Sequence, residues 1–287
     1  MDVRHEAADF LKSRRARITP EQAGLPAWGE RRRVTGLRRE EVALLAGVSV
    51  EYYVRLERGN VGGASESVLE AVANALKLND AERAHLFDLA RTASAPARRT
   101  AGPARGAVRE QVQWLLDSMS GTAAYVRNAR TDILAANALG RALYAPVLAM
   151  PGRPNVARFV FLDPAAQGLF GEWRKVAYEA SALLRTMAGE NPYDHALTEL
   201  VGELSTRSEL FRTLWAQHDV RQHRTGVKRF RHPVVGELTL AYESMQLTAD
   251  QGLRLNAYVA EPGTDSAERL TLLASWASTP EPVTSLD

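Results

Sequence analysis

Apolar residues recur every three to four positions through the first 93 residues of this 287-residue chain. This spacing predicts helices, each with one buried face. We expect them over residues 3–17, 39–46, 50–58, 65–78 and 79–93, with Ser65 and Asn79 as the caps of the last two. The stretch 19–36 contains Pro20 and Pro26, so it is expected to be irregular. The pattern therefore predicts an all-α domain over residues 1–93.

The pattern changes after residues 94–106, which contain Pro96, Pro103 and three Arg and are typical of a linker. From residue 107 to residue 278, short alternating runs are mixed with helical ones. The predicted strands are 121–127, 132–136, 225–232, 238–243 and 253–259; the predicted helices are 137–144, 155–162, 169–188, 193–204, 208–218 and 266–277. Five strands split around a helical insert predict an α+β domain with a five-stranded antiparallel sheet and helices on one face. Residues 279–287 are expected to be a flexible tail.

Residues 37–59 have the features of a helix-turn-helix. Val42, Leu45 and Ala46 are spaced to share the inner face of the first helix. Gly47 can end that helix in the left-handed conformation, and Ser49 can cap the next one. The second helix is then expected to bury Tyr53 and Leu56 and to expose Val50, Glu51, Val54 and Arg55.

These motifs resemble known families. The spacing of Ala43, Gly47, Ser49, Leu56, Glu57 and Gly59 is similar to that of the λ repressor-like (xenobiotic-response-element type) helix-turn-helix. Together with residues 36–43, 47–53 and the His-Pro-x-x-Gly block within 229–238, it resembles the MmyB-like transcription regulators over nearly the whole chain. The resemblance implies a DNA-binding domain followed by a PAS-like ligand-binding domain.

The resemblance also implies which residues face double-stranded DNA. The base-facing positions correspond to Ser49, Val50, Glu51, Val54 and Arg55. Glu51 can accept a hydrogen bond from cytosine, and Arg55 can reach guanine or a phosphate. Tyr52 is expected to contact the DNA backbone, with packing beside Tyr53 as the alternative.

Basic residues gather in this half of the chain, where 18 basic residues stand against 14 acidic ones up to residue 105. Arg31, Arg32 and Arg33 are expected to form a backbone-contacting arm, the alternative being a solvated surface. Arg38 and Arg39 open a helix at a position where relatives place a capping Thr or Ser. A DNA phosphate there would offset the lost cap, unless Glu40 and Glu41 simply neutralise them. The preference for Arg over Lys suits phosphate contacts but is also expected from a GC-rich genome.

Aromatic residues are concentrated in the second domain. The expected pocket-lining residues are Phe159, Phe161, Trp173, Phe211, Trp215, Phe230, Tyr242 and Met245. The alternative is an ordinary aromatic core. The MmyB-like resemblance implies a fatty-acid-like ligand, whose carboxylate would need a cationic anchor such as His218, Arg229, Arg231 or His232.

Other classes find little support. The chain has no cysteine, which excludes disulfides and suits a cytoplasmic protein. The sequence contains no run of eighteen apolar residues, so no membrane span is predicted. His218, His223 and His232 match no compact metal motif, and no signature of a hydrolase or P-loop enzyme occurs, so no metal, cofactor or catalysis is expected.

Two functional hypotheses follow. In the first, a homodimeric transcription factor on an inverted repeat responds to a small apolar effector bound by its second domain. In the second, that domain serves only for dimerisation or for binding a partner protein.

Overall fold

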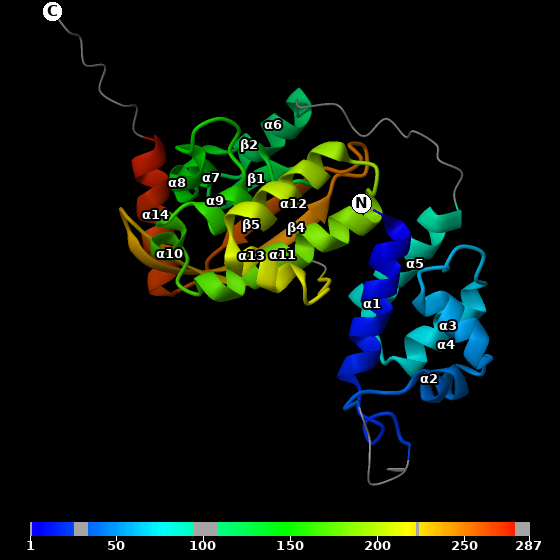
Figure 1. Cartoon of the computed structure of the whole chain (residues 1–287). Coiled ribbons are helices and arrows are strands. Elements are labelled where there is room, and N and C mark those ends of the chain that lie inside the picture. The colour runs from blue at the N-terminus through cyan, green and yellow to red at the C-terminus, as the bar shows by residue number, and fades with distance from the viewer. Residues whose placement is uncertain (1, 26–33, 95–107, 222–223, 279–287) are drawn as a thin grey trace, which may run out of the picture. The chain divides into compact units, whose positions relative to one another are not determined.

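The structure is a computed structural model that describes residues 2–25, 34–94, 108–221 and 224–278. Its elements are α1 Val3–Arg17, α2 Arg39–Ala46, α3 Val50–Glu57, α4 Glu66–Ala75, α5 Asp80–Ser94, α6 Glu110–Ser118, β1 Ala123–Arg127, β2 Ile133–Ala136, α7 Ala138–Leu143, α8 Ala145–Leu148, α9 Val156–Leu162, α10 Ala165–Leu169, α11 Trp173–Glu190, α12 His195–Arg207, α13 Glu209–Trp215, β3 Thr225–His232, β4 Gly236–Gln246, β5 Arg254–Val259 and α14 Asp265–Ser278 (Figure 1). The predicted fold class is confirmed: a helical domain precedes an α+β domain with a five-stranded antiparallel sheet.

The chain forms two compact units. The first unit contains residues 1–102, 181–199 and 212–222; the second unit contains residues 103–180, 200–211 and 223–287. Helix α11 thus contributes its amino-terminal half to the second unit and its carboxy-terminal half to the first. Segments from the middle of the chain therefore belong to the same unit as the helix-turn-helix.

Local signals account for the helices of the first unit. Ser65 Oγ accepts from the backbone N–H of Val68 at 3.3 Å, which caps α4. Asn79 and Glu82 form the predicted capping box, with side-chain-to-backbone hydrogen bonds of 3.0 Å in both directions. The apolar faces of α1 to α5 meet in one core, to which Val220 of the third segment also belongs.

One predicted core residue is wrong. Leu45 is 36% exposed, and Ala43 is buried in its place beside Val42 and Ala46. In a helix of only eight residues, a rotation by one position changes which side chains face inward, and periodicity does not determine that rotation.

A buried charge cluster joins α1 to the later segments of the first unit. The Glu6 carboxylate is 6% exposed and accepts a hydrogen bond from Arg185 on α11. The ring nitrogens of His218 and His85 lie 3.6 and 3.8 Å from the same carboxylate oxygen. Arg185 also stacks on Trp215, 4.0 Å from the ring centroid. Glu6 is therefore the anion on which these cationic and histidine side chains converge.

This cluster lowers the pKa of the Glu6 carboxyl. Burial alone would raise its pKa. The ring nitrogens of His218 and His85 beside the carboxylate, together with the charge and hydrogen bond of Arg185, act in the opposite direction and hold the pKa well below its ordinary value.

The sheet of the second unit has the order β2-β1-β5-β4-β3, with every neighbouring pair antiparallel. The predicted β-hairpins β1–β2 and β3–β4 form, and β5 joins them by pairing with both β1 and β4. The loop that follows Pro233 closes at Gly236, where φ is +79°, a conformation that glycine adopts without strain.

The two faces of the sheet have different covers. Helix α6, which the sequence analysis did not predict, places Val112 and Leu116 against Ala124, Val126 and Leu255 on the outer face. The inner face carries aromatic side chains, which alternate along the strands with the small apolar residues of the outer face. Covering on both sides explains why every residue of β1 is buried.

The predicted helix 169–188 is interrupted. The structure has α10 ending at Leu169 and α11 beginning at Trp173. Between them Phe170 forms an isolated bridge to Phe230, and the N–H of Gly171 donates to Arg229 O at 2.9 Å. Pairing with β3 replaces the helical hydrogen bonds here, a competition that helical periodicity alone does not reveal.

We expect the Glu6–Arg185 pair to stabilise the first unit. Arg185→Met leaves a buried carboxylate without its cation, which costs about 3–5 kcal/mol. The double variant Glu6→Gln/Arg185→Met should lose much less than the sum of the two single variants. Hydrogen exchange of α1 peptides in the full-length protein measures these energies, with Lys12→Met on the exposed side of α1 as the control.

The pH dependence has a definite sign. A carboxyl whose folded pKa is depressed stabilises the fold at neutral pH, and this contribution declines as the pH falls below about 4.5. Glu6→Gln should remove that part of the acid sensitivity. In the double-variant experiment above, a loss of stability equal to the sum of the losses of Glu6→Gln and Arg185→Met would contradict the coupling of the two residues.

Candidate functional site

The turn between α2 and α3 has the geometry that the sequence predicts. Gly47 ends α2 with φ +64°, in the left-handed conformation, and the N–H of Val48 donates to Ala43 O at 3.0 Å. Ser49 Oγ then accepts from the N–H of Tyr52 at 3.1 Å and caps α3. The direction of α3 relative to α2 is thus set by local hydrogen bonds.

The inward side of α3 is held by a buried carboxylate. Glu57 is 1% exposed, and its two oxygens accept separate hydrogen bonds from Arg15 on α1 and Arg39 on α2. Arg15 also donates to Leu37 O at 2.8 Å. Three helices therefore meet at one anion, and α3 cannot tilt without breaking charge-assisted bonds.

The outward side of α3 presents a mixed surface. Val50, Glu51 and Arg55 are exposed, and Val54 is partly buried. The Arg55 guanidinium lies over the Tyr52 ring, 4.6 Å from its centroid. Apolar, acidic and basic groups therefore stand on one helical face, a composition that suits base edges better than it suits a second protein core.

The two arginines at the start of α2 differ. Arg38 makes no side-chain cap; its backbone N–H donates to Glu41 at 2.6 Å, and its side chain is exposed. Arg39 is bound to Glu57, which raises the pKa of its guanidinium. Of these two arginines, Arg39 is therefore held by a side chain of α3, whereas the Arg38 side chain faces solvent. Arg31, Arg32 and Arg33 lie outside the described residues.

In the second unit, aromatic rings on the inner face of the sheet form a continuous cluster. Tyr258 on β5 contacts Tyr125, Tyr144 and Phe230, with ring centroids 5.7–6.1 Å apart. The Tyr144 hydroxyl donates to Tyr258 Oη at 2.7 Å. The inner face of the sheet therefore carries a packed cluster of aromatic side chains.

Comparisons with known families agree with this geometry. A model described as "MmyB-like transcription regulator ligand binding domain" matches residues 108–273, and one described as "Helix-turn-helix domain" matches residues 6–86. The first match alone covers more than half of the chain. The chain belongs to the MmyB-like transcription regulators. No curated protein matches it.

Most of the aromatic residues predicted to line a pocket of this MmyB-like regulator are buried in the second unit. Phe159, Phe211, Phe230 and Tyr242 are at most 5% exposed. Phe161 packs on Phe211 with centroids 4.9 Å apart. Trp173 Nε1 donates to Val160 O at 2.9 Å. These side chains are packed within the second unit.

Two predicted lining residues lie elsewhere. Met245 is on the outer face of β4 and is 44% exposed, because it alternates with the inward-facing Tyr242 and Ser244. Trp215 belongs to the first unit, where it stacks on Arg185. Neither shares the inner face of the sheet.

The four predicted anchors are also placed away from the aromatic cluster or already engaged. Arg229 and Arg231 are exposed on the outer side of β3. His218 contacts Glu6 in the first unit. His232 has one ring nitrogen on Ala142 O at 3.0 Å and the other on the N–H of Val234 at 3.3 Å, and burial lowers its pKa. The anchor role of these four residues stays a prediction from the sequence, and two of them, His218 and His232, already have partners. The described residues contain no group of three His, Cys, Asp or Glu that would hold a metal ion.

Sequence reasoning missed Lys228. It lies on β3 between the exposed Val227 and Arg229, and it is only 7% exposed. Alternation was the available signal, since Lys228 and Phe230 are two residues apart and must share a face of the strand.

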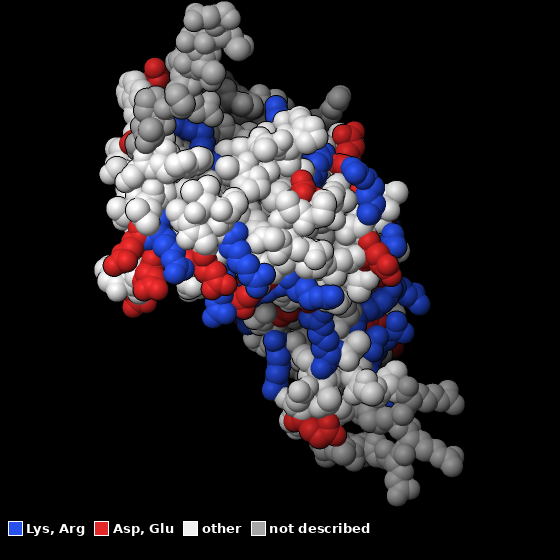
Figure 2. Space-filling view, turned by 90° about the vertical axis from the view of Figure 1, so that its left-hand side faces the viewer, with Lys and Arg blue, Asp and Glu red and all other residues white. Residues whose placement is uncertain are grey.

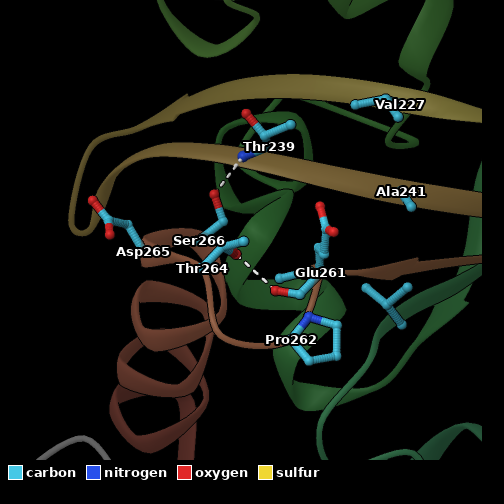
Figure 3. Close-up of a pocket in the computed structure, with 10 residues that line it drawn as sticks. Val227, Thr239, Ala241, Glu261, Pro262, Thr264, Asp265 and Ser266 are labelled. Carbon is cyan, nitrogen blue, oxygen red and sulfur yellow. Dashed lines mark hydrogen bonds between the residues drawn. The ribbon is translucent and has the colours of Figure 1, made fainter.

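The outer face of the sheet carries a separate hollow of about 740 Å³. Figure 3 shows Val227, Thr239 and Ala241 on its sheet side, facing the segment of Glu261 and Pro262. Ser266 Oγ accepts from the N–H of Thr239 at 2.9 Å and joins the start of α14 to β4. None of the predicted pocket residues lines this hollow, and its two acidic residues, Glu261 and Asp265, suit an anion poorly.

No helix in the described parts of the chain is long and apolar enough to cross a membrane.

Proposed function

We propose that this MmyB-like transcription regulator reads double-stranded DNA in the cytoplasm with the outward side of α3. The observation that carries the proposal is the clamp at Glu57, which fixes α3 while Val50, Glu51 and Arg55 remain exposed. A recognition helix must be rigidly held and still present unpaired side chains to the groove. Ser49 and Val54 complete the base-facing set, and Tyr52 supports Arg55 from beside it.

The proposed backbone contacts are Arg38 and, with their structure outside the described residues, Arg31, Arg32 and Arg33. Arg39 stays a candidate because its side chain is 48% exposed, although its bond to Glu57 ties any contact to the position of α3.

The proposed effector is a small apolar, fatty-acid-like molecule held by the second unit. The continuous ring cluster on the inner face of the sheet and the ligand-binding family match support it. The competing proposal is a domain used only for dimerisation or for a partner protein. An effector can switch DNA binding only if it binds two states of the protein with different affinity.

A homodimer is proposed because two half-sites give a repressor-type module the affinity that one lacks. Leu272 and Trp276 on α14 are 63% and 54% exposed and, four residues apart, share one helical face. Figure 2 shows a wide area of uncharged side chains on the face of the molecule that it draws. We propose that α14 packs against a second copy of the chain.

Removing one phosphate contact should flatten the salt dependence of binding. For Arg38→Ala we expect weaker binding to every duplex. The slope of the logarithm of the binding constant against the logarithm of the salt concentration should become shallower by about 0.9, the value for one phosphate contact. Fluorescence anisotropy over a range of salt concentrations measures it. Arg231→Ala, which removes an exposed arginine of the sheet, is the control. An unchanged slope in Arg38→Ala would refute this contact.

Removing a base contact should change sequence preference instead. For Glu51→Ala we expect loss of preference at one cytosine position, worth about 1–3 kcal/mol. Selection from a random duplex library measures it. Glu40→Ala changes the charge equally at an exposed position of α2 and should return the parental site. The same site from both variants would exclude a role of Glu51 in base reading.

The dimer proposal predicts that Leu272→Ser/Trp276→Ser is monomeric in sedimentation analysis. Trp114→Ser/Leu115→Ser removes a similar pair of exposed apolar side chains from α6 and is the control. A monomer from the α6 variant and a dimer from the α14 variant would assign the interface to α6 instead.

A further inference from the structure

Lys228 places an ammonium group inside the aromatic cluster of the second unit. Its Nζ lies 5.6–5.7 Å from the ring centroids of Phe170, Tyr242 and Tyr258. Its hydrogen bond goes to Tyr258 Oη at 3.5 Å, which is long. The group has three donors, so most of its hydrogen-bonding capacity is directed at ring faces.

No carboxylate of the described residues lies within 4.0 Å of this ammonium. Tyr258, its hydrogen-bond partner, does not supply a negative charge either, because burial raises the pKa of its hydroxyl well above the ordinary value. Burial in turn lowers the pKa of Lys228. A buried cation without an anion is costly, and proteins keep such groups mainly where they have a function.

The electrostatic surroundings favour an added anion. Arg127, at the end of β1, is also buried and repels the positive charge of Lys228. Glu179 on α11 attracts it, but from beyond ion-pair distance. The Lys228 ammonium therefore lies among aromatic rings, beside a second buried cation and without a carboxylate at ion-pair distance.

We propose that Lys228 is the anchor of the effector and binds a carboxylate head group, with Tyr258 as its neighbour. This proposal rests on the proposed function of the second unit as an effector-binding domain. It replaces the anchors expected from the sequence with a residue whose ammonium lies among the aromatic rings.

The same rings define a course for the apolar part of the effector. Phe170, which faces Lys228, contacts Phe230 and Phe159 with centroids 5.7 and 6.1 Å apart. A chain that starts at Lys228 and follows these rings stays in contact with aromatic carbon. A carboxylate matches the single ammonium, whereas phosphate carries more charge and prefers the planar fork of an arginine.

The test compares two probes that differ only in the charge of the head group, dodecanoate and dodecanol. Isothermal titration of the full-length protein at pH 7 should give at least tenfold tighter binding of dodecanoate, equivalent to about 1.4 kcal/mol. Lys228→Met should abolish this preference, and Lys228→Arg should retain part of it. Lys175→Met removes an exposed lysine of α11 and should behave as the parent protein.

The outcomes separate this proposal from the one on which it rests. Equal affinity for both probes in the parent protein, or an unchanged preference in Lys228→Met, would overturn the anchor while leaving an apolar effector in place. If neither probe binds, both the Lys228 anchor and the apolar effector are overturned. That result would favour a second domain used only for dimerisation or for binding a partner protein. DNA binding without a probe is measured on the same samples, so the proposal that α3 reads DNA is tested separately from both of these results.

A second measurement needs no variant of Lys228. The chain has only four lysines: Lys12, Lys77, Lys175 and Lys228. With ¹³C-labelled lysine, the Lys→Arg variants of the other three assign the Lys228 signal by elimination. Saturating dodecanoate should shift that signal and dodecanol should not; a signal unmoved by dodecanoate would refute the contact.

Discussion

The bonds of Glu57 to Arg15 and Arg39 are the constraint on which the DNA-reading half depends. A buried carboxylate requires positive partners, and here they come from two different helices. Because each oxygen has its own guanidinium, α1, α2 and α3 are held in one arrangement. Val50, Glu51 and Arg55 stay exposed, since the bonds that hold α3 are made on its opposite side. The buried residue that holds α3 and the exposed residues of α3 thus lie on opposite sides of a helix of eight residues.

The second unit separates its tasks by strand alternation. One side of the sheet packs against α6 with small apolar residues, while the other carries rings and the buried cation of Lys228. An apolar core normally excludes charge, so the position of this lysine is the clearest departure from ordinary core chemistry in the unit. Departures of this kind cost stability and occur most often at functional sites. The same reasoning connects the family match, which names a ligand-binding domain, to one side chain.

The compact units do not follow the order of the chain. Residues 181–199 and 212–222 fall inside the ligand-binding family match, yet they belong to the first unit with the helix-turn-helix. The buried contact of Arg185 with Glu6 and the position of Val220 in the helical core give this assignment a physical basis. Helix α11 thus supplies residues to both units.

The sequence by itself determined most of the elements and the turn chemistry: Gly47 and Ser49 each act within a few residues, so their roles are readable from spacing. The five strands followed from equally local patterns, and the family from a resemblance over nearly the whole chain. Only the tertiary structure decided which charges meet. Glu57, Glu6 and Lys228 take their roles from residues far away in the chain, and periodicity places a residue on a face without saying what lies opposite. The rotation of α2, the interruption at Gly171 and the cover supplied by α6 were likewise set by packing between elements, a balance of energies that no single segment contains.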